Sequence, residues 1–266
     1  MNTLSCNWIS IICLYMMGLM TMCTKDETAI NKVPDVPLPA NLIFNETIEG
    51  NSPFSTARSI EIGDWDYALQ FVSSPVYRGT KSARFEIRED QPLVLSGKRS
   101  DVIIVKGTEG DITKNTWYSF AVYFPTEGFE RDSTLDVISQ WTKSGSPDRL
   151  LVIDDLLIFE SGDAKGNKQK NVIGEVTKDK WLEFIFHFIH SHEEDGLVEI
   201  WFNGVKMINL SGGNLYTNSL PKWAIGINKS SFINGTSEVN KRIIYFDNLR
   251  VGDENATYEI MEPDND

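Results

Sequence analysis

Apolar and polar residues alternate along much of the chain, most clearly from Trp181 to Gly204, WLEFIFHFIHSHEEDGLVEIWFNG. Two apolar runs joined by a polar turn predict a β-hairpin. Because side chains alternate along a strand, the phenylalanines from Phe184 to Phe188 share one face, which we expect to pack against a core. His187 and Trp201 fall on the opposite, mixed face. That face lines a groove if the hairpin is central in its sheet; the alternative is a sandwich strand with incidental polar residues.

From residue 41 onward, short runs of this kind are separated by clusters of Gly, Pro, Asn, Asp and Ser. No long amphipathic helix and no internal repeat interrupts them. The pattern predicts an all-β fold, a two-sheet β-sandwich or jelly roll over residues 41–256. In chain order, the predicted strands are Tyr67–Val72, Ser82–Ile87, Val102–Val105, Thr116–Phe124, Thr134–Trp141, Leu150–Ile153, Leu156–Phe159, Trp181–His190, Val198–Asn203, Trp223–Asn228 and Ile243–Val251.

Three polar segments stand out within and after this pattern. The Asp154-Asp155 pair is predicted to turn a small hairpin. Ser161–Asn171, SGDAKGNKQKN, is predicted to be a polar loop, either a plain solvated loop or a mobile flap over one end of the sandwich. Residues 257–266 are predicted to form an acidic, disordered tail.

The N-terminal segment has the pattern of an export signal. Trp8–Met22 is apolar but short for a membrane-spanning helix, and Cys23 follows it. We predict a signal peptide over residues 1–22, lipidation of Cys23 and a Pro-containing flexible tether over residues 23–40. Lys25–Glu27 resembles the surface-export signal of bacterial lipoproteins, so the expected location is the cell surface on the outer membrane. The alternative is an ordinary signal and a secreted or periplasmic protein.

Charge and cysteine content limit the partners. The net charge of −13 excludes a nucleic-acid partner, which requires a basic surface, but allows an acidic polysaccharide held on a local basic groove. All three cysteines lie in the first 23 residues, so the folded part has no disulfide framework. We expect a monomer that touches a membrane only through its lipid anchor.

Several short motifs follow one another along the predicted sandwich: Ser82–Glu86 (SARFE), Gly97–Asp101 (GKRSD), Trp117–Phe120 (WYSF), Ser139–Trp141 (SQW), Trp181–His187, Asp195–Gly204, Ile225–Ile227 (IGI) and Tyr245–Asn248 (YFDN). In this order they resemble a superfamily of polysaccharide lyases with a β-jelly-roll fold. It includes the heparin lyase I and glucuronan lyase groups and, more distantly, the family 7 alginate lyases. The resemblance spans Phe44 to Gly252.

The resemblance implies cleavage of a uronic-acid glycosidic bond by β-elimination. In such lyases the carboxylate beside the weakly acidic C5 proton is neutralised, a base removes the proton, and an acid protonates the leaving oxygen. By resemblance, Arg99 and Gln140 neutralise the carboxylate, and an arginine fork suits this role. Lys98, Trp201 and Lys229 are the expected substrate-binding residues.

Three positions depart from the family pattern. Asp101 replaces the glutamate of the family's Arg-Ser-Glu motif, and the other two departures concern proton transfer. Thr142 stands where the resemblance leads us to expect a histidine, and Asn228 where we expect a tyrosine. His187 is then the best remaining proton carrier, and a structural strand histidine is the alternative. Further candidates are Tyr216 and Tyr245, whereas His190 and His192 are expected to be solvated turn residues.

A second hypothesis is a glycan-binding protein on the same fold that has lost proton transfer. An orientation of His187 away from Arg99 and Gln140 would favour it. Hydrolysis by paired carboxylates, Glu183 and Glu199, is a third alternative.

No catalytic metal site and no cofactor are expected. Asp247 and Asn248 either hold a structural calcium or form hydrogen bonds at a strand end, and we favour the hydrogen bonds.

Overall fold

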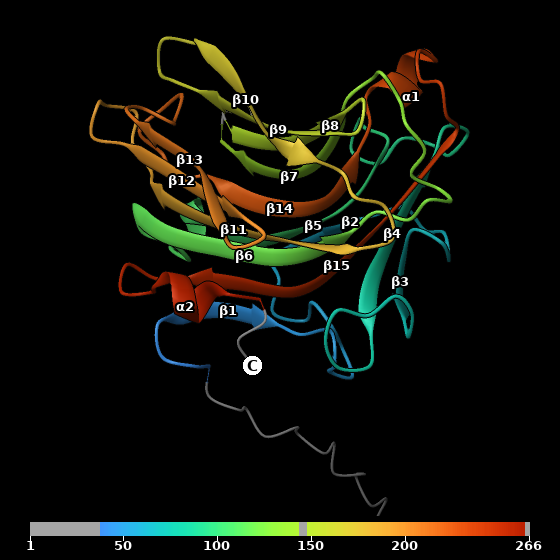
Figure 1. The fold of residues 1–266 in the computed structure, drawn as a ribbon, viewed down its shortest axis with the longest axis horizontal. Coiled ribbons are helices and arrows are strands. Elements are labelled where there is room, and N and C mark those ends of the chain that lie inside the picture. The colour runs from blue at the N-terminus through green and yellow to red at the C-terminus, as the bar shows by residue number, and fades with distance from the viewer. Residues whose placement is uncertain (1–37, 144–147, 264–266) are drawn as a thin grey trace, which may run out of the picture. The chain divides into compact units, whose positions relative to one another are not determined.

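The computed structural model describes residues 38–143 and 148–263. These residues form two antiparallel β-sheets packed face to face, so the predicted all-β sandwich is confirmed. The strands of both sheets curve, as β14 and β6 show in Figure 1. The predicted signal peptide, Cys23 and the tether as far as residue 37 lie outside the described residues.

Sheet A has eight strands in the order β13-β12-β11-β6-β15-β4-β3, and β1 also pairs with β15. Its strands are β1 (Leu42–Glu46), β3 (Leu69–Val72), β4 (Ser82–Arg88), β6 (Asn115–Tyr123), β11 (Trp181–Ile189), β12 (Leu197–Phe202), β13 (Val205–Ser211) and β15 (Lys241–Gly252).

Sheet B has seven strands in the order β10-β9-β8-β7-β14-β5-β2. Its strands are β2 (Ser59–Glu61), β5 (Arg99–Lys106), β7 (Asp136–Thr142), β8 (Asp148–Ile153), β9 (Leu156–Gly162), β10 (Lys168–Glu175) and β14 (Lys222–Asn228).

The core lies between the two sheets, and the hairpin predicted from alternation supplies much of it. In β11, Phe184, Phe186 and Phe188 are fully buried. They meet aromatic residues of sheet B, with 4.8 Å between the ring centroids of Phe186 and Trp141. Trp223 of β14 joins the same cluster. Because side chains alternate along a strand, the residues that pack into this core determine which residues of each central strand point outward.

The strands missed from the sequence are short or lie at an edge. β10 begins at Lys168, within the segment predicted to be a polar loop, and most of its residues are exposed. It is an edge strand, so its backbone pairs with β9 while its side chains remain in water and need no apolar alternation. The predicted turn at Asp154-Asp155 is present between β8 and β9, where both residues have positive φ.

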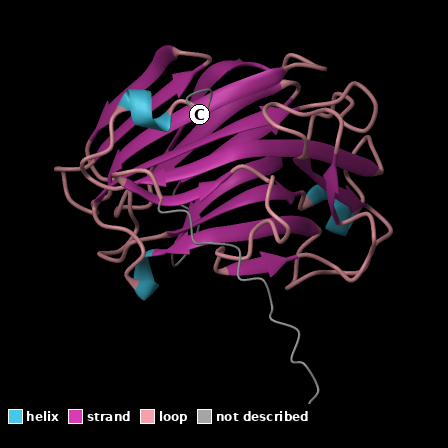
Figure 2. Cartoon of the chain, turned by 90° about the horizontal axis from the view of Figure 1, so that it is seen from below, coloured by secondary structure: helices cyan, strands magenta, loops and turns pink. Residues whose placement is uncertain are grey.

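Helix is confined to three short segments of the described chain (Figure 2): η1 (Gly107–Glu109), α1 (Ser231–Asn234) and α2 (Tyr258–Met261). Helix α2 differs from the predicted disordered tail. Met261 is fully buried in a cluster with Ile185 of β11, because this apolar residue of the acidic segment packs on the outer face of sheet A. Among the described residues, no helix is long and apolar enough to cross a membrane.

Candidate functional site: a trough on the outer face of sheet B

The outer face of sheet B holds the polar residues of three central strands. On β7, Trp141 packs inward, so Gln140 and Thr142 point outward. On β5, Val102 and Ile104 pack inward, so Arg99 and Asp101 point outward. The strands β5 and β7 both pair with β14, which runs between them. The structure therefore places Arg99 and Gln140 on one face, on the two strands that flank β14.

The outward residues in the middle of β14 are small and leave a shallow trough. Ala224 and Gly226 form its floor, while Asp101 and Gln140 stand on its two sides. We call these four residues the β14 trough. The trough measures about 10 Å³, roughly the space that one water molecule needs.

Glycine is required at position 226. Its φ is +135°, and a Cβ there would lie 2.3 Å from the carbonyl oxygen of Ser100 and 2.8 Å from the Cβ of Asp101. A side chain would therefore collide with β5 and cover Asp101. The residue keeps the trough open and lets the two strands approach closely.

Asp101 is a buried carboxylate beside this trough. Its exposed fraction is 3%, and its Oδ1 has no hydrogen-bond partner among the described residues. Burial raises the pKa of Asp101 to about 7, and the nearby charge of Glu61 adds to the rise. Arg99 and Lys222 oppose it, with Arg99 Nη1 3.8 Å from Asp101 Oδ2.

Arg99 is held near the trough by a second carboxylate. Its Nη1 donates to Glu61 Oε2 at 2.8 Å, and Lys222 Nζ lies 3.6 Å from Glu61 Oε1. A substrate carboxylate that binds Arg99 must share the guanidinium with Glu61. Opposite Arg99, Asn228 occupies β14, and Thr142 follows Gln140 on β7. No histidine or tyrosine of the described chain lines the trough.

A basic cluster continues the face beyond Gln140. In register across the sheet, Gln140 pairs with Arg149, Arg149 with Glu160 and Glu160 with Lys170. Although burial acts to raise it, the pKa of Glu160 is held below its usual range by Arg149 and Lys168. Arg149 Nε donates to Glu160 at 3.1 Å, and the amines of Lys168 and Lys170 lie 3.3 and 3.8 Å from it.

This basic cluster is not among the features predicted from the sequence. Its residues come from three strands, and only cross-strand pairing brings them together. The one available signal was a set of basic residues at alternate positions of the polar segment before Asn171.

His187 lies on the opposite side of the molecule, and its predicted place beside Arg99 and Gln140 is wrong. It belongs to β11 of sheet A and points away from the core. Its ring stacks on Trp117 at 4.0 Å and is hydrogen-bonded at 2.8 Å to both Glu199 and Asn115. Alternation identified the residues that share its face, but could not tell that this face is the outer side of the other sheet. By the criterion stated above, this placement favours the binding hypothesis unless another group near the trough can accept a proton.

The three residues predicted to bind substrate also lie elsewhere. Trp201 is on the outer face of sheet A, 5.7 Å from Trp117 between ring centroids. Lys229 is completely buried and pairs with Asp136 at 3.0 Å, so it cannot contact a polysaccharide. The amine of Lys98 donates to the backbone carbonyls of residues 89 and 91, so it anchors the preceding turn.

The remaining proton-carrier candidates are also outside the trough. His190 is not a solvated turn residue: it is fully buried, and burial lowers its pKa to about 3. Tyr245 packs against Tyr123 in sheet A. Tyr216 packs against Gly162, at the end of β9.

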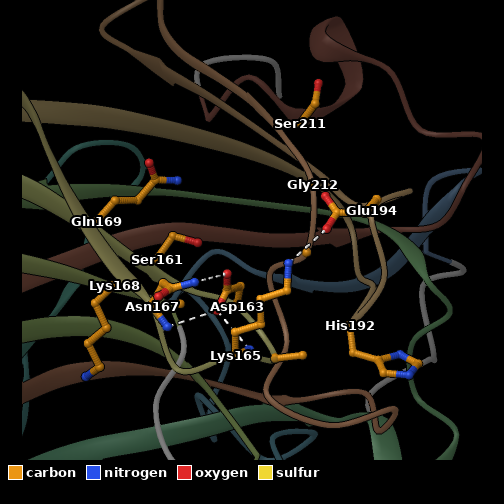
Figure 3. Close-up of a pocket in the computed structure, with 13 residues that line it drawn as sticks. Ser161, Asp163, Lys165, Asn167, Lys168, Gln169, His192, Glu194, Ser211 and Gly212 are labelled. Atoms are coloured by element: carbon orange, nitrogen blue, oxygen red, sulfur yellow. Dashed lines mark hydrogen bonds and ion pairs between the residues drawn. The ribbon is translucent and has the colours of Figure 1, made fainter.

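His192 lines a separate polar pocket of about 260 Å³ at that end. In Figure 3, Lys165 reaches across this pocket to Glu194, with 3.6 Å between their charged atoms.

The structure also places the carboxylate pair Glu183 and Glu199 and the candidate calcium ligands Asp247 and Asn248. Glu183 accepts a hydrogen bond from the Tyr77 hydroxyl at 2.7 Å, and Glu199 is bound to His187, so the two carboxylates are engaged separately on sheet A. Asp247 accepts backbone N–H groups from Tyr77 at 3.0 Å and Asn248 at 2.9 Å, as the hydrogen-bonding alternative predicts. No cluster of three or more metal-binding side chains occurs in the described part of the chain.

Comparison with solved structures identifies similar folds. An endo-β-1,4-glucuronan lyase from the fungus Trichoderma reesei has a TM-score of 0.67 at 15% identity, covering 85% of this chain and all of the other. The binding domain of botulinum neurotoxin DC has a TM-score of 0.55 at 13% identity, covering 80% of this chain and 47% of the other. The alginate lyase AlyC3 has a TM-score of 0.47 at 12% identity, covering 64% and 74% of the two chains.

The sequence comparisons give the family. No curated protein matches the sequence. The family model for polysaccharide lyases matches residues 46–250, which contain every strand that forms the trough. Because this match covers more than half of the chain, the protein belongs to the polysaccharide lyase family.

Proposed function

We propose that the protein is a polysaccharide lyase that holds an acidic polysaccharide across the outer face of sheet B and cleaves it by β-elimination. The observation that carries the proposal is the placement of Arg99 and Gln140 on the two strands that flank the β14 trough, in a chain of this family. Arg99 would bind the uronate carboxylate, and Gln140 would donate its amide N–H to it. Neutralising this carboxylate stabilises the charge that develops when the C5 proton leaves.

The charge of the face supports an anionic substrate. Five cations and three carboxylates point outward near the trough, an excess of two positive charges (5 − 3 = 2) on a protein whose net charge is −13. A local basic surface of this kind attracts polyanions despite the overall charge. The glucuronan lyase among the similar structures is named for a polyuronate. The residues counted are Arg99, Arg149, Lys168, Lys170, Lys222, Glu61, Asp101 and Glu160.

Binding without cleavage is the second candidate function. Thr142 and Asn228 stand where the family resemblance leads us to expect proton-transfer residues, and no histidine or tyrosine of the described residues lines the trough. The same face would then hold the polymer without breaking it.

A substrate panel separates the two functions. The purified protein is mixed with glucuronan, alginate and heparin, and the ultraviolet absorbance of an unsaturated uronate is followed while binding is measured by calorimetry. Cleavage predicts rising absorbance on at least one polymer. Binding with constant absorbance on all of them would leave the second candidate.

Arg99→Ala should weaken binding of the cleaved polymer by about 1.5–3 kcal/mol, the value of a hydrogen bond to a charged group. Arg131→Ala is the matched control, because Arg131 is exposed and pairs only with Asp154 among the described residues. Equal affinities for the two variants would remove Arg99 from the site.

We also propose that Cys23 is lipidated and anchors the protein at the cell surface. The apolar stretch before Cys23 and the Lys25–Glu27 segment after it support this location. Metabolic labelling with a fatty acid should label the wild type and not Cys23→Ala. Label that persists in the variant would disprove the anchor.

A further inference from the structure

Asp101 is placed to take part in proton transfer at the trough. It pairs with Gly226 across β5 and β14, and both residues line the trough beside Gln140. Its side chain is buried, yet Oδ1 has no hydrogen-bond partner among the described residues. A buried carboxylate oxygen without a donor is costly, and in the described chain Asp136 and Asp148 also have one, but of the three only Asp101 lines the trough.

Because residue 226 is glycine, no side chain of β14 covers Asp101, whose side chain lines the trough and is 5% exposed although its Oδ1 is buried. Any larger residue would place its Cβ 2.8 Å from the Cβ of Asp101 and close the approach from β14. The open space suits one water molecule or one atom of a sugar ring that descends into the trough. A proton acceptor acts either directly or through one such water.

The charges around Asp101 keep it both basic and ionisable. Arg99 of β5 and Lys222 of β14 attract its negative charge and lower its pKa, while Glu61 of β2 repels that charge, shares a side-chain hydrogen bond with Asp101 and raises the pKa. Together with burial these groups bring its pKa to about 7, close to the value that suits a general base at neutral pH. Ordinary solvent-exposed aspartates titrate about three units lower and are weaker bases.

We propose that Asp101 is the proton acceptor of this lyase. It would take the role of the histidine and tyrosine that the family resemblance leads us to expect at Thr142 and Asn228. The inference rests on the proposed function. The C5–H bond breaks and its proton moves to the Asp101 carboxylate, while the electron pair forms the C4=C5 double bond. The bond between C4 and the glycosidic oxygen breaks, its electron pair remains on that oxygen, and a solvent water in the open trough protonates it. The hydroxide left behind takes the proton from Asp101, which restores the carboxylate.

The central test compares Asp101→Asn with the wild type on whichever polyuronate the wild type cleaves. The amide keeps the shape of the side chain but cannot accept the proton. We expect kcat to fall by about 100-fold or more, the range of general base catalysis, while the affinity measured by calorimetry changes by less than about threefold. Asp111→Asn is the control, because Asp111 binds Arg58 away from the trough. His187→Asn tests the proton carrier expected from the sequence and should leave kcat within about twofold, because His187 lies on the other sheet.

The pH profile of the wild type provides a second measurement that needs no variant. Since Asp101 must be ionised to accept a proton, kcat/KM should rise with pH through about 7 and then level off. A profile that is flat from pH 5 to 8, or an Asp101→Asn variant with wild-type kcat, would overturn the assignment of Asp101 while cleavage itself stands. A wild type that binds polyuronates and cleaves none would instead overturn the proposed lyase function, and the Asp101 assignment with it.

Discussion

Asp101 and Asp247 are both carboxylates whose pKa is raised to about 7 by burial, but their surroundings differ. Asp247 receives backbone N–H groups from Tyr77, Arg78 and Asn248, which describes a structural group that fastens a loop to β15. Asp101 keeps one oxygen without a partner among the described residues and faces a trough. The two carboxylates therefore have similar pKa values but different roles, and their hydrogen-bond partners distinguish these roles.

Asp247 should make stability depend on pH. Its pKa is higher in the folded chain than in the unfolded chain, so the folded chain binds the proton more tightly. The stability from this proton is complete below about pH 4 and is lost as the pH rises through about 7. Asp247→Asn cannot titrate, so the free energy of unfolding of the wild type minus that of the variant should decrease from pH 4 to pH 7, measured by urea unfolding.

Asp179→Asn is the control for this measurement. Asp179 is exposed and hydrogen bonds from Thr126 hold its pKa below the usual range, so its titration lies below that window. The difference for this variant should stay constant from pH 4 to pH 7. A difference for Asp247→Asn that stays level or increases would contradict the assigned direction.

At the scale of elements, β14 shows how one strand serves the core and the site. Trp223, Ile225 and Ile227 pack inward, while Ala224 and Gly226 form the outward floor of the trough. The sequence predicted this strand correctly and assigned Asn228 to its end. It did not predict β10 and β13, because residues of edge strands are largely exposed and need not alternate.

Replacing the floor of the trough should be costly. Gly226→Ala adds a Cβ at positive φ that collides with β5, and we expect a loss of about 3 kcal/mol in the free energy of unfolding. Gly110→Ala separates the two causes, because Gly110 has φ +78° and no atom within 4 Å of the added Cβ. It should cost only about 1 kcal/mol in the same urea experiment. Similar losses for both variants would mean that the collision is relieved without cost.

The C-terminal end of β14 is joined to β7 and β15 by buried ion pairs. Lys229 Nζ lies 3.0 Å from Asp136 and 3.4 Å from Asp132, and Arg242 Nε donates to Asp136 at 3.0 Å. Lys229→Met leaves these carboxylates without one of their buried cations, and should lower the free energy of unfolding by about 3–5 kcal/mol. Lys180→Met, at an exposed position, should change it by less than about 0.5 kcal/mol. A loss below about 1 kcal/mol for Lys229→Met would show that the cluster contributes little.

At the scale of the whole molecule, the local charge near the trough has the opposite sign to the net charge of the protein. The chain carries a net charge of −13, yet the outer face of sheet B has an excess of basic groups near the trough. The described fold contains no cysteine, so its stability comes from the core and from such ion pairs. The proposed binding of an acidic polysaccharide would then rest on this face.

Affinity for a polyuronate should therefore depend strongly on salt. Raising the sodium chloride concentration from about 50 to about 200 mM shortens the screening length and should weaken binding several-fold in calorimetry. The double substitution of Lys168 and Lys170 by Glu should reduce both the affinity and its salt dependence. Lys81→Glu combined with Lys180→Glu changes the net charge equally at residues outside sheet B. Identical effects of the two double substitutions would mean that net charge alone controls binding.

The sequence by itself determined the all-β fold, most of the strands, the family and the strand that carries Gln140, whereas the strand predicted at Val102–Val105 begins at Arg99 in the structure. Alternation is a local property with a period of two residues, so it tells which side chains share a face of a strand. Only the tertiary structure decided which sheet each strand joins and which neighbours each side chain meets. For that reason His187 moved to the far face and Lys229 into a buried cluster. The carboxylate of Asp101 acquired Glu61 and Lys222 as neighbours, from strands far apart in the sequence.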